Sequence, residues 1–273
     1  KTDLAMRNVS KAYQNFSKAY ELDPKNNEVI SQFATLSFNY RQFQKAIELA
    51  KNCVNCVNAS RILGMSYYNL EDYGKAEKYL KDALSKNSQD AYAAYTLAQT
   101  YLELEDGKSA IVLFQKAIEL EPQSQWMYEL GLVCYNQNDY KGALKYFEMA
   151  ANKGYNKSND FYENYGFAQL YSGDTENGIN TLNIVLERKP NNKELINNMA
   201  YAMYDTKKYN EALDYFKKLL DINPKDATTM YMAGLTFQKL GQKEKGQKIC
   251  DIAIELNPSL KMYRQKNELP AGL

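Results

Sequence analysis

The positions of the prolines constrain the fold of this chain more than any other feature of its sequence. Pro190, Pro224 and Pro258 lie 34 residues apart, and Pro122 precedes Pro190 by 68, which is twice that distance. Pro24 stands 98 residues before Pro122, four fewer than three such intervals. Each of these prolines follows a helix-like stretch such as IELEP or LDINP, and proline cannot continue a helix. We therefore expect a repeated unit of 34 residues that ends with a helix.

The residues that precede each proline recur in the same way. Ala110 stands twelve positions before Pro122 and Phe114 eight before, so both side chains fall on one face of an α-helix. A second helical pattern comes earlier in each unit, with a bulky-small pair followed by a bulky residue, as in Leu97-Ala98 and Tyr101. Short polar turns separate the two helices, so each unit is expected to be a helix–turn–helix.

Composition excludes several classes of function. The chain has 34 Lys+Arg against 33 Asp+Glu, which is far from the basic character of a nucleic-acid binder. It has no histidine, and this absence excludes Ser-His-Asp and Cys-His nucleophiles and histidine-ligated metals. We find no phosphate-binding glycine loop, nucleophile elbow or EF-hand loop. We therefore expect no enzyme, no catalytic residues, no metal, no cofactor and no nucleic-acid partner.

The sequence says less about where the protein works. No apolar run approaches the roughly 18 residues that a membrane span needs. We expect a soluble protein, either cytoplasmic or periplasmic. A composition rich in Asn, Lys and Tyr (24 tyrosines) favours a bacterium with an AT-rich genome.

Two of the four cysteines, Cys53 and Cys56, form a C-x-x-C motif. Neither a second such pair nor a histidine is present to complete a zinc site. The repeat pattern places Cys53, Cys134 and Cys250 at core positions, where cysteine behaves as a small hydrophobe. We therefore favour a structural role for these cysteines. A disulfide between Cys53 and Cys56 is the second interpretation, and a catalytic redox role is the third.

Together these patterns resemble the tetratricopeptide repeat family, whose helix–turn–helix units are 34 residues long. Small residues that the family places at positions 8, 20 and 27 are matched in three successive repeats by Gly64, Ala76 and Ala83, by Ala98, Ala110 and Ala117, and by Gly131, Ala143 and Ala150. The resemblance implies an all-α fold, a right-handed α-solenoid of such repeats. It implies an unpaired or capping helix at 1–26, seven repeats at 27–56, 57–90, 91–123, 124–158, 159–192, 193–226 and 227–260, and a capping helix and tail at 261–273.

The same resemblance implies where a partner would bind. In this family, certain positions of the first helix of each repeat usually face a concave groove. Here those positions give a predicted partner-binding set of Arg61, Tyr68, Tyr92, Tyr95, Gln99, Tyr128, Tyr135, Phe167, Tyr171, Asn197, Tyr201, Tyr204 and Tyr231. Tyrosine and arginine are enriched at binding hot spots, and amide side chains can pair with an extended backbone. The alternative is that tyrosine simply fills the interfaces between repeats.

The resemblance favours a non-enzymatic interaction module or scaffold that binds a peptide segment or helix of a partner protein. The family's clamp for acidic chaperone C-termini needs Lys, Asn or Arg at groove positions that this chain fills differently, so we expect a partner that is not strongly anionic. Two alternatives stay open. The chain could be a structural solenoid that forms a homo-oligomer through its ends, because its first helix lacks a mate. It could also be the recognition part of a larger protein with a separate effector domain.

Overall fold

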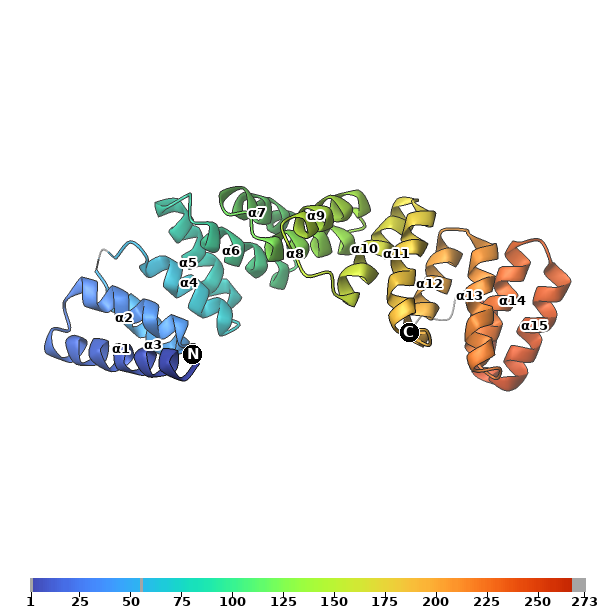
Figure 1. Ribbon diagram of the computed structural model, residues 1–273, viewed down its shortest axis with the longest axis horizontal. Helices are drawn as coiled ribbons and strands as arrows, with labels where there is room; N and C mark the ends of the chain where they lie inside the picture. The colour runs from blue at the N-terminus through green and yellow to red at the C-terminus, as the bar shows by residue number, and fades with distance from the viewer. Residues whose placement is uncertain (1, 55, 267–273) are drawn as a thin grey trace. The chain divides into compact units, whose positions relative to one another are not determined.

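A computed structural model describes residues 2–54 and 56–266, and across these residues it contains α-helices, one short 3-10 helix and no strand (Figure 1). This confirms the all-α prediction. The chain forms two compact units. Unit 1 comprises residues 1–137 and 152–154, and unit 2 comprises residues 138–151 and 155–273.

Unit 1 is a stack of helix pairs preceded by a single helix. Its helices are α1 (Thr2–Leu22), α2 (Asn27–Asn39), α3 (Phe43–Asn52), α4 (Ala59–Asn69), α5 (Tyr73–Lys86), α6 (Ala91–Glu103), α7 (Gly107–Leu120) and α8 (Ser124–Asn136). Within each pair, α2 packs on α3, α4 on α5 and α6 on α7, and each second helix also contacts the first helix of the next pair. The first helices α2, α4 and α6 contact one another in turn, so they share one face of the unit.

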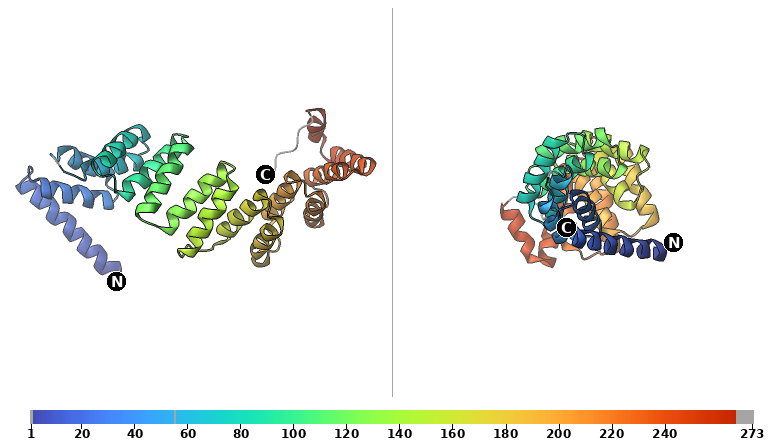
Figure 2. Two further views of the ribbon diagram at one scale, coloured as in Figure 1. Left: turned by 90° about the horizontal axis from the view of Figure 1, so that it is seen from above. Right: turned by 90° about the vertical axis from the view of Figure 1, so that its left-hand side faces the viewer.

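Unit 2 repeats the same arrangement. Its helices are α9 (Tyr140–Asn152), α10 (Asn159–Ser172), α11 (Thr175–Arg188), α12 (Lys193–Asp205), α13 (Tyr209–Ile222), α14 (Ala227–Lys239), α15 (Lys243–Leu256), the 3-10 helix η1 (Pro258–Leu260) and α16 (Lys261–Lys266). The pairs are α10 with α11, α12 with α13 and α14 with α15. The ribbon views show the helices of each unit following one another in chain order (Figure 2).

Small residues allow the two helices of a pair to approach closely. Gly64 of α4 faces Leu80 of α5, and a Cβ atom on Gly64 would lie only 2.5 Å from the Leu80 Cγ atom. Ala76 and Ala110, at the position that the repeat pattern reserves for a small residue, are fully buried. The small residues identified from the sequence therefore do lie at the centre of the helix pairs, where volume is most restricted.

The turn inside each pair contains a residue with left-handed backbone angles, and its sequence does not predict this geometry. Glu71 has φ 60°, and it ends α4 in a Schellman motif in which the Asp72 N–H donates to the Tyr67 carbonyl oxygen at 3.0 Å. Equivalent left-handed residues occur at Arg41, Glu105, Asn138, Gly173, Lys207 and Gly241. Only two of these are glycine, the residue that adopts such angles at least cost.

The helix predicted at 1–26 packs on the first full repeat. The Tyr13 ring lies 5.0 Å from that of Phe33 in α2, and Phe16 and Tyr20 pack against the same core cluster. At the C-terminal end, Leu260 is buried against α14 and α15. Helix α16 forms residues 261–266 of the capping helix and tail predicted at 261–273. The remaining tail, 267–273, lies outside the described residues.

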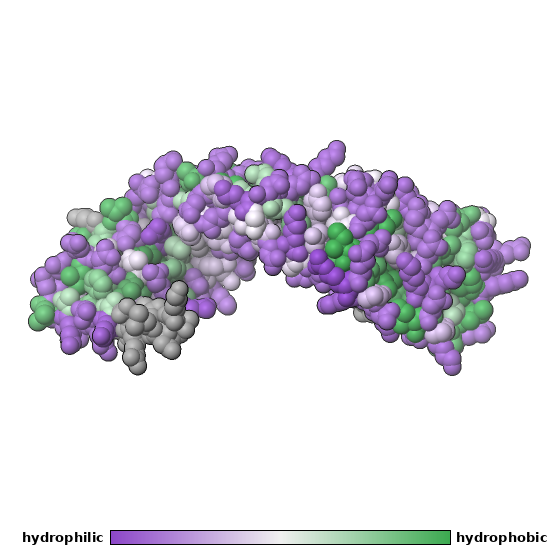
Figure 3. Space-filling model, viewed as in Figure 1, coloured by the Kyte–Doolittle hydropathy of each residue, from purple (hydrophilic) through white to green (hydrophobic). Residues whose placement is uncertain are grey.

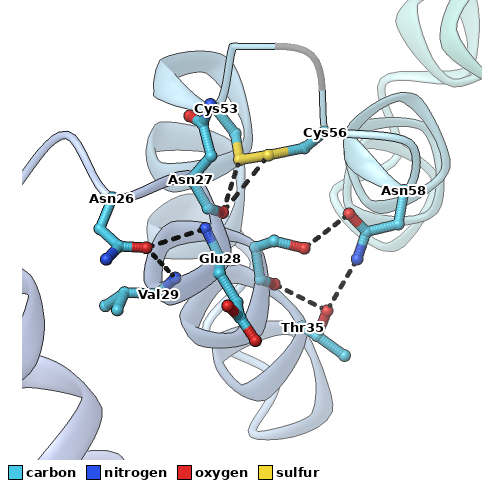
Figure 4. The surroundings of a disulfide bond; sticks show 9 residues. Asn26, Asn27, Glu28, Val29, Thr35, Cys53, Cys56 and Asn58 are labelled. Atoms are coloured by element: carbon cyan, nitrogen blue, oxygen red, sulfur yellow. Dashed lines mark hydrogen bonds between the residues drawn. A yellow bond between two sulfur atoms is a disulfide. The ribbon is translucent and has the colours of Figure 1, made fainter.

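The structure corrects the interpretation that we favoured for Cys53 and Cys56. The two residues form a disulfide with 5.6 Å between their Cα atoms (Figure 4). The first repeat is four residues short, so α3 ends at Asn52 and both cysteines fall in the tight turn that follows. Cys53 still fills a core position with 8% exposure, as its place in the repeat predicts. Cys134 and Cys250 lie outside this disulfide and are buried, as their core positions in the repeat predict.

This turn is also anchored on α2. Both sulfurs of the disulfide lie close to the carbonyl oxygen of Asn27, at 3.4 and 3.5 Å (Figure 4). Two residues after the disulfide, the Asn58 side chain accepts a hydrogen bond from the Ser31 hydroxyl at 2.8 Å and donates one to Thr35 at 3.1 Å. These contacts, rather than a proline, end the first repeat.

Candidate functional site

In unit 1 the first helices build a small pocket. Its volume is about 250 Å³, and its lining combines residues of α4, α6, α7 and α8, namely Tyr68, Gln99, Leu102, Glu103, Phe114, Glu129, Leu132, Val133 and Asn136. We call this the α4–α6–α8 pocket. Two residues of the predicted binding set, Tyr68 and Gln99, line it, because the consecutive first helices α4 and α6 contact each other.

Hydrogen bonds fix the polar groups around this pocket. The Tyr95 hydroxyl donates to Glu129 Oε2 at 2.7 Å and accepts from Gln99 Nε2 at 2.8 Å. The other carboxylate oxygen of Glu129 accepts from Gln125 Nε2 at 2.8 Å. Burial, together with the hydrogen bond to Glu129, raises the pKa of Tyr95 well above its usual range, so this phenol stays protonated.

Beside the pocket, two predicted tyrosines rest on the single tryptophan. The Tyr95 ring stacks on Trp126 at 4.6 Å between centroids, and the Tyr92 ring meets Trp126 edge-on at 5.2 Å. Tyr92 is 43% exposed and accepts a hydrogen bond from Gln123 Nε2 at 2.9 Å. Trp126 itself is only 3% exposed, so it serves as a rigid base that orients the rings above it.

The remaining predicted residues of unit 1 differ in accessibility. Arg61 is half-buried and lies 3.6 Å from Asp90, to which it is ion-paired. Tyr135 is half-buried on α8. Tyr128 is buried with 7% exposure and therefore offers little surface to a partner.

In unit 2 the predicted residues gather on α10, α12 and α14. Phe167, Tyr171, Asn197 and Tyr201 are half-buried, and Tyr171 stacks on Tyr140 at 5.0 Å. Burial, followed by the nearby carboxylates Asp226 and Asp205, raises the pKa of Tyr201 to about 12.

Two predicted residues of unit 2, Tyr204 and Tyr231, are 7% and 2% exposed. Both line a hollow of about 890 Å³ that α12, α14, α15 and α16 share. Four cationic side chains also line this hollow, Lys207, Lys239, Lys243 and Arg264. One of them, Arg264, is held by a hydrogen bond to Asp251 at 2.8 Å.

Three features of these faces were not predicted from the sequence: the two carboxylates Glu103 and Glu129, the ring of Trp126, and an apolar hollow. Glu103 occupies one of the groove positions and could have been identified from it, whereas Glu129 occupies a position that the groove pattern omits. Trp126 could have been noticed as the single tryptophan of the chain. The third feature is an apolar hollow of about 560 Å³ between α13, α14 and α15, which includes Leu213, Met230, Phe237 and Ile252. Hydrophobic side chains gather over these C-terminal helices in Figure 3.

The described residues contain no group of three or more His, Cys, Asp or Glu side chains placed to hold a metal ion. None of the helices in the same range combines the length and apolar character needed to cross a membrane.

Comparisons with known proteins agree with the repeat architecture. Three family models described as tetratricopeptide repeat match residues 69–128, 194–226 and 227–260. A TPR repeat-containing protein of Methanocaldococcus jannaschii is 23% identical over 93% of this chain and 44% of its own length. The BBSome complex member BBS4 of Bos taurus is 24% identical over 93% of this chain and 49% of its own length. The chain thus spans about half the length of these curated relatives.

A solved structure shows the same fold. The C-terminal part of a TPR repeat-containing protein from Cytophaga hutchinsonii superposes with a TM-score of 0.60, covering 88% of this chain and all of that one at 19% identity. The repeat spacing, the paired helices and these matches lead to one conclusion: the chain belongs to the tetratricopeptide repeat family.

Proposed function

We propose that this chain is a non-catalytic scaffold that holds a peptide segment or helix of a partner protein on the faces made by its first helices. The observation that carries this proposal is the arrangement in unit 1. There, the exposed ring of Tyr92 rests on the buried Trp126, and Gln99, on the same helix as Tyr92, lines the α4–α6–α8 pocket. Rigid aromatic anchors with polar ends are what binding hot spots require.

The relatives are consistent with this role. BBS4 is, by its name, a member of the BBSome complex, and it is similar to this chain over 93% of the chain's length. An extended partner segment could use the amide of Gln99 and the hydroxyls of Tyr68 and Tyr92 as hydrogen-bonding groups.

An affinity capture with paired variants tests the proposal. The immobilised chain is exposed to lysate of the source organism, and retained proteins are identified by mass spectrometry. Tyr68→Ala combined with Tyr92→Ala removes two rings from the first-helix face and should abolish capture of the partner. Tyr79→Ala is the control, because it removes a half-buried tyrosine from the second helix α5. Equal capture by all three proteins, with helicity unchanged, would place the binding site elsewhere.

Self-assembly through the ends is the second candidate. The face of α1 that carries Tyr13, Phe16 and Tyr20 already packs on the first repeat, so it is not free to stack on another copy. The C-terminal end instead exposes Ile252 (50%) and Leu256 (47%). Molecular mass measured across a concentration series tests this candidate, and a monomer at every concentration would exclude it.

A further inference from the structure

The α4–α6–α8 pocket has a lining of mixed character. Leu102, Leu132 and Val133 supply apolar surface, Phe114 lies beneath with no exposure, and Glu103 and Glu129 add two carboxylates. Its volume of about 250 Å³ lies below the roughly 300–1,000 Å³ of small-molecule sites. The pocket therefore has room for one long side chain rather than for a separate ligand.

The negative charge in this pocket is not neutralised within the described part of the chain. Glu129 accepts its hydrogen bonds from a phenol and an amide, Tyr95 and Gln125, which carry no charge. Neither Glu103 nor Glu129 belongs to any of the ion pairs found among the described side chains. Arg61, the one cation of the predicted set, is ion-paired with Asp90.

Tyr68, which lines the pocket, lies in the electrostatic field of the same two carboxylates. The pKa of Tyr68 is raised, first by burial and then by the charges of Glu103 and, more weakly, Glu129. A site that disfavours a second negative charge favours a positive one, and more so where surrounding protein excludes water.

We propose that the α4–α6–α8 pocket receives a lysine or arginine side chain presented by the partner segment. The aliphatic stem of such a residue packs along Leu102, Leu132 and Val133, and its charged end reaches the two carboxylates. The ring of Tyr68 provides aromatic surface for the cation. This inference rests on the proposed function, and it names the chemistry by which unit 1 selects its partner.

Selection from a displayed library of random peptides tests the proposal with the whole chain as bait. Peptides enriched on the wild-type chain should carry a lysine or arginine next to apolar residues. A chosen peptide should bind at least about tenfold more weakly when its basic residue is changed to norleucine. The same loss should follow from Glu103→Gln combined with Glu129→Gln, which keeps side-chain size and one acceptor oxygen in each group while removing both charges. Peptides with lysine exchanged for arginine show which of the two the pocket prefers.

The control variant is Glu119→Gln combined with Glu187→Gln. It removes the same two charges from exposed positions on the second helices α7 and α11, and it should bind like the wild type. Added salt should weaken binding to the wild type and to this control more than binding to the Glu103/Glu129 variant. Circular dichroism confirms that each variant is folded.

The outcomes separate this inference from the proposed function. Enriched peptides that lack basic residues but fail to bind the Tyr68→Ala, Tyr92→Ala variant overturn the inference and leave the binding face in place. Undiminished binding of lysine or arginine peptides to the Glu103/Glu129 variant also overturns it. Peptides that bind the tyrosine variant as well as the wild type overturn both.

Discussion

Single residues of small volume set how closely the two helices of a repeat approach. At Gly64 the facing atoms belong to Leu80, including its backbone nitrogen at 3.0 Å from a Cβ atom built on the glycine. At Gly234 the facing atoms include the Cys250 sulfur and the Gly246 carbonyl oxygen. Backbone atoms cannot move aside as a flexible side chain can, so these glycines are required by packing.

Gly64→Ala should lower the free energy of unfolding by about 1–3 kcal/mol, because the added methyl group overpacks the contact with α5. Gly74→Ala is the matched substitution. Gly74 is exposed near the start of α5 with no atom within 4 Å of its would-be Cβ, so alanine there should stabilise by about 0.5 kcal/mol. Urea unfolding followed by circular dichroism measures both, and equal effects of the two changes would contradict this account.

At the scale of elements, each second helix begins at a turn with nearly constant backbone angles. Asp72, Asp106 and Asp174 occupy the N-cap with φ between −94° and −85° and ψ between 70° and 72°, and each accepts a hydrogen bond from the N–H three residues later. Lys208 occupies the same position before α13 with φ −86° and ψ 64°, but it makes no side-chain capping bond. Lys208 therefore has the backbone geometry of an N-cap residue but lacks a side chain that accepts the capping hydrogen bond.

Lys208→Asp should stabilise the protein by about 0.5–1 kcal/mol, because the new carboxylate can accept from the first turn of α13. Asp106→Ala should have the opposite effect, of about 1 kcal/mol, by removing the acceptor that serves Ser109 N–H. Thermal unfolding of both variants measures the pair. A destabilised Lys208→Asp variant would show that the side chain cannot reach the turn.

The disulfide between Cys53 and Cys56 cross-links another local element, the turn after α3. Reduction should destabilise the N-terminal repeats by roughly 1–2 kcal/mol, since it releases a short loop. A thiol reagent should react slowly with the native oxidised protein. Cys134 and Cys250 are buried, and burial raises the pKa of Cys250 to about 11. After reduction, fast labelling should appear at Cys56, whereas fast labelling before reduction would argue against the disulfide.

At the scale of the whole molecule, we expect tyrosine ionisation to determine how the stability of the fold changes at high pH. Tyr165 and Tyr201 both have a folded-state pKa raised to about 12, chiefly by burial, against an ordinary value of 10.0. Below about pH 9 both the folded and unfolded states keep these phenols protonated, so stability is unaffected. Between the two pKa values the unfolded state loses the proton and the folded state keeps it, so stability falls as pH rises.

The unfolding midpoint should therefore stay level up to about pH 9 and decline between pH 10 and 12. Tyr201→Phe keeps the ring but cannot ionise, so its decline should be shallower than that of the wild type. Differential scanning calorimetry across this range provides the comparison. Identical slopes for the two proteins would show that Tyr201 is not held in its neutral form by folding.

The sequence by itself determined the repeat and its helices. Proline spacing and the recurrence of small residues such as Ala76 and Ala110 are local features, because one repeat contacts only its neighbours. For the same reason the helix boundaries around Pro122 and Pro224 could be predicted from short stretches of chain.

Only the tertiary structure decided which side chains come together and which are covered. The fifth position of the repeat gave Tyr95 a half-buried ring and Tyr231 a buried one, because burial depends on the neighbouring helix rather than on the residue's own turn. The pocket that joins Glu103 of α6 to Glu129 of α8 likewise depends on how successive first helices pack. The Cys53–Cys56 disulfide depended on where α3 ended, which is a consequence of packing that spacing alone left open.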